Sequence, residues 1–350
     1  LGDETTNGNN VAVGYLSMSS SEYSAKNVAV GSNTLQNITH GSTTDTYNTA
    51  VGYNAGINVT SGIRNTLVGG LAGDSLTQGA YNTAVGMFAL STEDANGYNT
   101  AVGYGVLEQQ NAGADVYNTA VGYATGNAIT TGGYNTLMGG FTGDALTTGA
   151  HNVAIGYAAL STEDTRGYNI AIGAYALQDL NAAADAYNVV IGYQSAKEMT
   201  TGTYNTVLGS QAMSTGVTTG DYNVAIGTRA GDDMTSGAYN NVIGSNAGMN
   251  LTTGSYNVAF GYDALKTEDT GGRSIAIGTG TLQAQNNDDN NYNIAIGHNA
   301  ANALTTGTNN IFIGGVAADT ITTGDSNVAI GKNAMGAADG SESNNVAIGF

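Results

Sequence analysis

A short motif, Asn-x-Ala-(Val/Ile)-Gly, recurs along the whole 350-residue chain and constrains its fold more than any other feature. Its twenty copies are mostly 17 residues apart, with a few steps of 18, 19 and 21 residues. A repeat this short and regular is typical of a solenoid, in which each turn stacks on its neighbours. The sequence therefore predicts an all-β parallel solenoid of about twenty turns, formed by a single repeat array over residues 1–350. The motif glycines stand at positions 14, 31, 52, 69, 86, 103, 122, 139, 156, 173, 192, 209, 227, 244, 261, 278, 297, 314, 331 and 349.

The three residues before each motif glycine predict a short strand, because they are mostly β-branched or apolar. In the copy ending at Gly156, alternation places Val153 and Ile155 on one face and Ala154 on the other. Both faces are apolar, so we expect both to be buried. One face can fill the interior of the turn. The other is expected to contact identical chains around a three-fold axis, with the small alanines permitting close approach.

Asparagine stands four residues before the motif glycine in nineteen of the twenty copies, and only Ser274 departs from it. Asparagine is a poor strand former, so its recurrence needs a specific cause. Turns stacked about 4.8 Å apart would let the side-chain amides hydrogen-bond along the stacking axis as a ladder. Glycine-containing corners such as Thr147-Thr148-Gly149 are expected to turn the chain between strands.

Composition excludes several classes of protein. The chain has 53 Gly but no Pro, Cys or Trp, and it is 41% hydrophobic, so it is neither collagen nor a disordered Gly-rich chain. The absence of Cys removes disulfides and thiolate chemistry. With a net charge of −19 the chain is not expected to bind nucleic acid. No apolar run reaches the roughly 18 residues of a membrane span, so no membrane insertion is expected.

Two positions of the repeat carry most of the 21 tyrosines. Twelve tyrosines precede the motif asparagine and seven follow the motif glycine. Stacked at one register, they are expected to form aromatic ladders, either for structural stacking or as a surface on which glycans stack. His151 occupies one of these tyrosine positions, and no histidine has a partner at a spacing that suits a zinc site or a nucleophilic triad. We therefore do not expect an enzyme.

The stretch Asn152-Val153-Ala154-Ile155-Gly156, followed by Tyr157-Ala158-Ala159-Leu160, resembles the head repeats of trimeric autotransporter adhesins. It resembles more closely the related repeat arrays of bacteriophage tail fibres, and the resemblance covers the whole chain. It implies a left-handed, trimeric β-roll that serves as an extracellular attachment fibre on a virion or a cell surface. The expected partner is a cell-surface glycan or protein receptor. The repeat is longer than that of the adhesin heads, which favours the phage-type fibre.

An acidic corner that recurs three times is the candidate site. Each copy contains a Glu-Asp pair, and the following turn is always a 19-residue turn with further Asp. Unpaired carboxylates one turn apart repel each other, and Ca²⁺, which takes about six to eight oxygen ligands, would relieve that repulsion. A solvated acidic rim is the alternative, and a paired-carboxylate glycosidase fits threefold duplication poorly. The candidate Ca²⁺ ligands are Glu93, Asp94, Asp115, Glu163, Asp164, Asp185, Glu268, Asp269, Asp288 and Asp289.

Threonine stands three residues before the motif glycine in six successive turns, from Thr49 to Thr136. A flat threonine ladder could order water and bind ice, but the column becomes Val153 and Ile170 farther on, which suits a buried position. The expected function is therefore structural and adhesive, as a segment of a phage tail fibre for host attachment. A bacterial surface adhesin or extracellular filament, and an ice-binding solenoid, are the alternatives. Because Phe350 follows a motif glycine without a polar cap, the natural chain is expected to continue.

Overall fold

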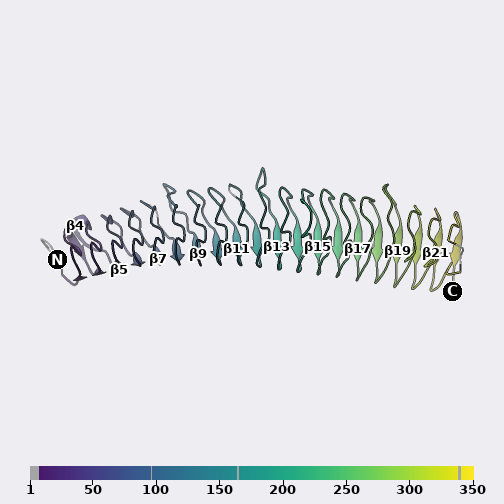
Figure 1. The fold of residues 1–350 in the computed structure, drawn as a ribbon, viewed down its shortest axis with the longest axis horizontal. Helices are drawn as coiled ribbons and strands as arrows, with labels where there is room; N and C mark the ends of the chain where they lie inside the picture. Colours follow the sequence, from purple (N-terminus) through teal and green to yellow (C-terminus); the bar gives the residue numbers. More distant parts are fainter. Residues whose placement is uncertain (1–7, 96, 164, 338–339) are drawn as a thin grey trace. The chain divides into compact units, whose positions relative to one another are not determined.

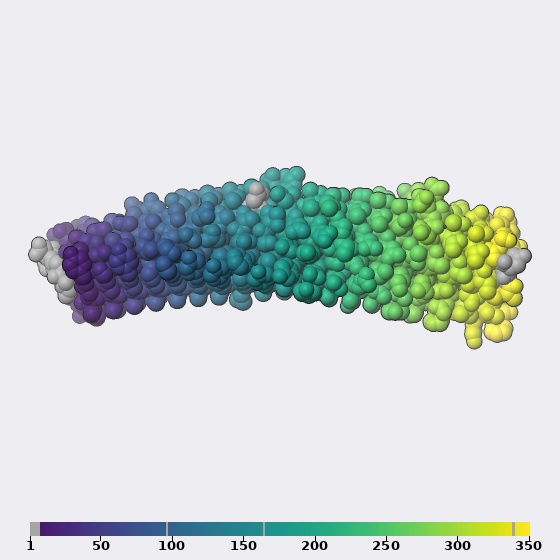
Figure 2. All heavy atoms as spheres, viewed as in Figure 1, coloured from purple at the N-terminus to yellow at the C-terminus, as the bar shows by residue number. Residues whose placement is uncertain are grey.

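The computed structural model describes residues 8–95, 97–163, 165–337 and 340–350, and in these ranges the chain contains strands and turns but no helix (Figure 1). It is a parallel β-solenoid of about twenty turns, as the repeat predicts. The chain divides into two compact units, the first ending at Asn169 and the second beginning at Ile170. Figure 2 shows the side chains of successive turns packed together within each unit.

In the first unit, the strand before each motif glycine pairs in parallel with the equivalent strand of the next turn. The register is strict, so that Val28 pairs with Thr49 and Thr49 with Thr66. A separate parallel pair, β2 with β4, uses the extra residues of the 21-residue turn. The strands are β1 (Val11–Val13), β2 (Glu22–Ala25), β3 (Val28–Val30), β4 (Thr39–Asp45), β5 (Thr49–Val51), β6 (Thr66–Val68), β7 (Thr83–Val85), β8 (Thr100–Val102), β9 (Thr119–Val121), β10 (Thr136–Met138) and β11 (Val153–Ile155).

The second unit repeats this arrangement with larger aliphatic residues. Its pairing stays in register across the 18-residue step, where Thr206 pairs with Val224, and across the 19-residue step, where Ile275 pairs with Ile294. Extra residues are therefore accommodated in the corners and not in the sheet. The strands are β12 (Ile170–Ile172), β13 (Val189–Ile191), β14 (Thr206–Leu208), β15 (Val224–Ile226), β16 (Asn241–Ile243), β17 (Val258–Phe260), β18 (Ile275–Ile277), β19 (Ile294–Ile296), β20 (Ile311–Ile313), β21 (Val328–Ile330) and β22 (Val346–Ile348).

Each three-residue strand between β3 and β21 buries its middle residue and turns its two outer residues toward the surface. Ala154 is fully buried, whereas Val153 and Ile155 are only partly buried. The prediction that the small alanines permit close approach of another chain is therefore wrong. They face the interior because the narrow turn also encloses the asparagine and leucine columns there. The outward columns of Val, Ile and Thr are the ones available for contacts.

Two positions of the repeat fill the interior together: the strand alanine and the residue four positions after the motif glycine. Where Leu or Phe replaces the strand alanine, the residue four positions after the neighbouring motif glycines is small. Leu67 shows the effect, because a Cβ on Gly56 or Gly73 would lie 2.6 or 2.9 Å from its methyl carbons. Phe312 is likewise fully buried in a stretch where Ala301 and Ala318 hold that position. Close packing of this kind penalises changes of even one methylene.

The asparagine ladder is confirmed, and its main partner is the backbone. The Asn240 carboxamide oxygen accepts the backbone N–H of Asn257 at 2.9 Å, and its Nδ2 donates to the carbonyl of Gly254 at 2.9 Å. Direct amide-to-amide bonds also occur, as from Asn310 Nδ2 to Asn293 Oδ1 at 3.1 Å. Each asparagine thus connects two turns and satisfies backbone groups that the short strands leave free.

Candidate functional site

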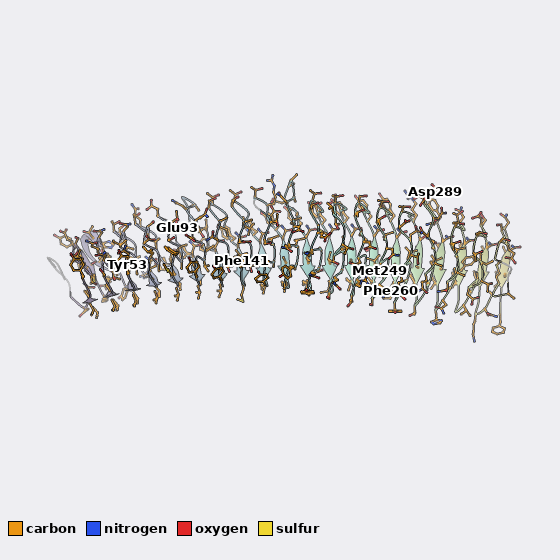
Figure 3. All side chains as sticks on the ribbon, viewed as in Figure 1. Tyr53, Glu93, Phe141, Met249, Phe260 and Asp289 are labelled. Atoms are coloured by element: carbon orange, nitrogen blue, oxygen red, sulfur yellow. The ribbon has the colours of Figure 1, made fainter. Side chains whose placement is uncertain are left out.

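The three glutamates of the recurring Glu-Asp pair lie inside the turns (Figure 3 labels Glu93). Each stands seven residues after a motif glycine, the position that Leu76 and Leu146 occupy in other turns. All three are fully buried, while the neighbouring Asp94 is exposed. The interpretation of this corner as a solvated rim is therefore wrong for the glutamates, because they replace residues of a buried apolar column. They are Glu93, Glu163 and Glu268.

Glu268 is the centre of a buried polar cluster. Its Oε2 accepts hydrogen bonds from Gln285 Nε2 and Asn291 Nδ2, both at 2.8 Å. Its Oε1 accepts the backbone N–H of Gly271 at 2.8 Å and that of Asn287 at 3.4 Å. Burial raises the pKa of Glu268, and the hydrogen bonds from Gln285 and the two backbone amides oppose this rise.

In the third copy, this cluster links the Glu-Asp corner to the 19-residue turn that follows it. Asn287 and Asn291 belong to the longer turn between Gly278 and Gly297, and both bond to Glu268 of the turn before. The glutamate therefore fastens the extra residues to the body of the solenoid. The same cluster accounts for the single departure from the asparagine column, because the Ser274 hydroxyl accepts a 2.8 Å hydrogen bond from Gln285 Nε2.

The other two copies share this position and differ in detail. Glu163 Oε1 accepts the backbone N–H of Arg166 at 3.0 Å and that of Thr165 at 3.3 Å. In the turn after Glu93, Gln110 is fully buried and its Oε1 accepts from Asn118 Nδ2 at 3.2 Å. In all three copies, the glutamate is thus a buried polar residue at a position that is apolar in most other turns.

The aspartates lie nearer the surface and act as acceptors. Asp115 Oδ1 accepts the backbone N–H of Gly97 at 3.0 Å, and Asp288 Oδ1 accepts the Thr270 hydroxyl at 3.0 Å. Asp185 and Asp289 are exposed, and Asp269 is partly exposed. The candidate ligand Asp164 lies outside the described residues. Across the described ranges, no three Asp, Glu or His side chains come close enough together to hold a metal ion, and calcium binding stays a prediction.

The tyrosines that precede the motif asparagine form stacked ladders. In the first unit, neighbouring ring centroids lie 4.8–5.5 Å apart from Tyr81 to Tyr168, and His151 stacks within this series as its position predicts. In the second unit, the separations from Tyr187 to Tyr256 are 4.9–5.2 Å. Each ring covers the face of its neighbour, so edges and hydroxyls face solvent. This geometry favours structural stacking over glycan stacking, which needs free ring faces.

Cations also occupy this column. Lys26 lies over the Tyr47 ring with 5.0 Å between Nζ and the centroid, and the Arg64 guanidinium carbon lies 5.2 Å from the centroid of Tyr81. Arg273 contacts the rings of both Tyr256 and Tyr292, at 4.9 and 5.7 Å. Cation–π contacts therefore continue the stacking where a tyrosine is missing. This role was not expected from the sequence, although these residues stand at the tyrosine position.

The tyrosines that follow the motif glycine are arranged less regularly (Figure 3 labels Tyr53). Tyr104 and Tyr123 stack with 5.4 Å between centroids, whereas Phe141 meets Tyr123 and Tyr157 edge-on. Glycines and small residues interrupt this column, so several rings are widely exposed. These rings add to the apolar surface beside the outward face of the strands.

The threonine column faces outward and is not a buried aliphatic position. Thr66, Thr119 and Thr136 are exposed, and the intervening threonines are partly buried. The threonines pair in register from strand to strand, as in Thr83 with Thr100. Burial therefore gives no reason to exclude a water-ordering role for the threonine column of the first unit.

No protein-family model matches this chain, and no curated protein matches it either. Among the described residues, none forms a helix of the length and apolar character that crossing a membrane requires.

Proposed function

We propose that this chain is a structural and adhesive segment of an extracellular fibre, of the kind that phage tail fibres use for attachment to a host surface. The observation that carries the proposal is the uninterrupted in-register pairing within each unit. Because of this pairing, every repeat adds about 4.8 Å to the length of the stack. A bacterial surface adhesin or filament would use the same property.

The fibre assembles as a trimer of left-handed β-rolls in this proposal, as the family resemblance implies. Support comes from the outward strand face of the second unit, where aliphatic and aromatic residues recur in turn after turn. Leu208 and Phe260 are 44% and 52% exposed there. A second copy of the chain carries the same repeat, so it can cover this face along every turn and remove the apolar surface from water.

Sedimentation and electron microscopy of the full chain test this assembly. We expect elongated trimers, and dissociation when Leu208 and Phe260 are both replaced by Asp. Val217→Asp is the matched control, because Val217 is 60% exposed but lies at a corner outside the strands. A compact monomeric wild-type chain would contradict the proposal, as would equal dissociation in the control.

The receptor in this proposal is a cell-surface glycan or protein. A net charge of −19 disfavours direct attraction to an anionic membrane and favours neutral partners or bridging cations. Binding of the labelled full chain to host cells, before and after enzymatic removal of surface glycans, separates the two receptor classes. Absence of binding under both conditions would contradict the adhesive role.

Ice binding is a second candidate because of the outward threonine column. Thr66, Thr119 and Thr136 are exposed on the outward face of a sheet whose strands pair in register. Thermal hysteresis of the wild-type chain, and its loss when Thr119 is replaced by Lys, would support this function. A wild-type chain without hysteresis excludes it.

A further inference from the structure

A shallow groove of about 540 Å³, lined by polar residues, crosses five turns of the first unit. It follows the corner on either side of the buried column that contains Val59 and Leu76. Residues one position before this column form one wall, and residues one position after it form the other. The first wall includes Asn37, Asn58 and Ser75, and the second includes Thr60, Thr77 and Asp94.

Several hydrogen-bond donors of the two walls bond to the solenoid itself. Asn37 Nδ2 donates to the carbonyl of Ile57 at 3.0 Å, and Asn58 Nδ2 donates to that of Asp74 at 2.8 Å. On the other wall, the Thr60 hydroxyl donates to the Thr77 carbonyl at 3.1 Å. The side-chain oxygens of these residues remain as acceptors toward the groove, and Ser75, Thr92 and Asn111 add hydroxyl and amide donors.

A groove lined by both acceptors and donors suits a ligand that can accept and donate hydrogen bonds. Arg and Lys are absent from the lining, so phosphate and sulfate groups find no counter-charge. Asp94 provides the single carboxylate, which is too few for a hard cation that needs several charged ligands. Sugar hydroxyls are donors at close and regular spacing, and the groove runs along successive turns, so an extended chain of sugars fits it best.

The polar residues of the first wall recur in many turns but not in all of them. The second wall continues in later turns as Thr130 and Thr147. The first wall is interrupted at Ala128 and Ala145, which stand where Asn58 and Ser75 stand 70 residues earlier, and polar residues return at Thr162 and Asp179. Stacking alone therefore does not require the polar side chains of this wall.

We propose that this groove binds an extended, uncharged glycan chain through the sugar hydroxyl groups. The inference rests on the proposed adhesive function and assigns its recognition site to the first unit. The tyrosine ladders take no part, since neighbouring rings cover their faces.

Binding of the full chain to a panel of immobilised linear oligosaccharides of glucose, N-acetylglucosamine, mannose and galactose tests the proposal. Ser75→Tyr fills the groove, and Ala145→Tyr is the matched control at the equivalent position outside it. We expect at least one oligosaccharide to bind, with affinity falling at least about tenfold in Ser75→Tyr and by less than about twofold in the control. Asn58→Ala, at an exposed position, should weaken the same interaction without filling the groove.

Each other outcome overturns the groove assignment. These outcomes are no binding to any oligosaccharide, unchanged binding in Ser75→Tyr, and equal loss in both tyrosine variants. Salt-sensitive binding of polylysine in place of sugars would show instead that the groove takes a basic polypeptide. Host-cell binding that survives in Ser75→Tyr would reject the groove while leaving the adhesive function in place. Absence of host-cell binding by the wild-type chain would contradict both the groove assignment and the adhesive function.

Discussion

Replacing Gly314 by alanine tests the physical basis of the stacking. Gly314 has a φ of +139°, and a Cβ there would lie 2.3 Å from the carbonyl oxygen of Gly331 in the next turn. A side chain in this backbone region costs about 1–3 kcal/mol in strain. Moving the next turn away also weakens interturn hydrogen bonds, which contribute about 1 kcal/mol each. We expect the local free energy of opening to fall by about 3 kcal/mol.

Native-state hydrogen exchange is the appropriate assay, because repeat arrays open locally and a single melting temperature averages over many turns. The amides of Ile311 and Val328 donate to the next turn at 2.8 Å and report on this region. A loss of about 3 kcal/mol corresponds to exchange faster by about a hundredfold.

Gly315→Ala is the matched control for this substitution. Gly315 adjoins Gly314, but a Cβ there would meet no atom within 4 Å and its φ is not in the left-handed region. We expect a change of less than about 0.5 kcal/mol. Equal exchange rates in the two variants would refute the reasoning that the motif glycines are required by contact between turns.

Three further predictions concern the candidate site and the ladders. Since the pKa of Glu268 is raised in the folded state, the stability it contributes is present at low pH and is lost as pH rises. Wild-type stability relative to Glu268→Gln should therefore fall as pH rises above about 4, the ordinary range of a glutamate carboxyl; denaturant unfolding measures this, with the exposed Asp289→Asn as control. Tyr222→Ala should destabilise the chain by about 1–2 kcal/mol, because it removes two stacked contacts, whereas Tyr222→Phe should be nearly neutral; a neutral alanine variant would show that stacking contributes little. Excess chelator should leave the melting temperature unchanged, because four donors already occupy the oxygens of Glu268; a lower melting temperature would show a bound cation.

Much of the fold could be predicted from the columns of the repeat. Residues before every motif glycine form the expected strands, and the asparagine and tyrosine columns form ladders. Part of the candidate site was also within reach of the sequence. Glu93 aligns with Leu76 seven residues after a motif glycine, and comparison along that column would have placed it inside the turn.

Other features could not be predicted, because they depend on contacts between turns. Tyrosines of the ladder adopt left-handed backbone conformations, such as a φ of +57° at Tyr222, which are uncommon for an aromatic residue. Their stacking partners lie in other turns, so no local propensity signals this conformation. The polar groove likewise requires two walls that become adjacent only after the corner has formed.

The period, the parallel register and the identity of each column follow from the sequence, because every repeat places the same residue types at the same spacing. Which strand face is interior depends on the folded turn. Alternation distinguishes two faces of a strand, but the volume enclosed by the turn selects the one that carries alanine. The tertiary structure also decided the role of the recurring glutamates. Gln285 and Asn291 reach Glu268 from the following turn, and stacking alone brings them together.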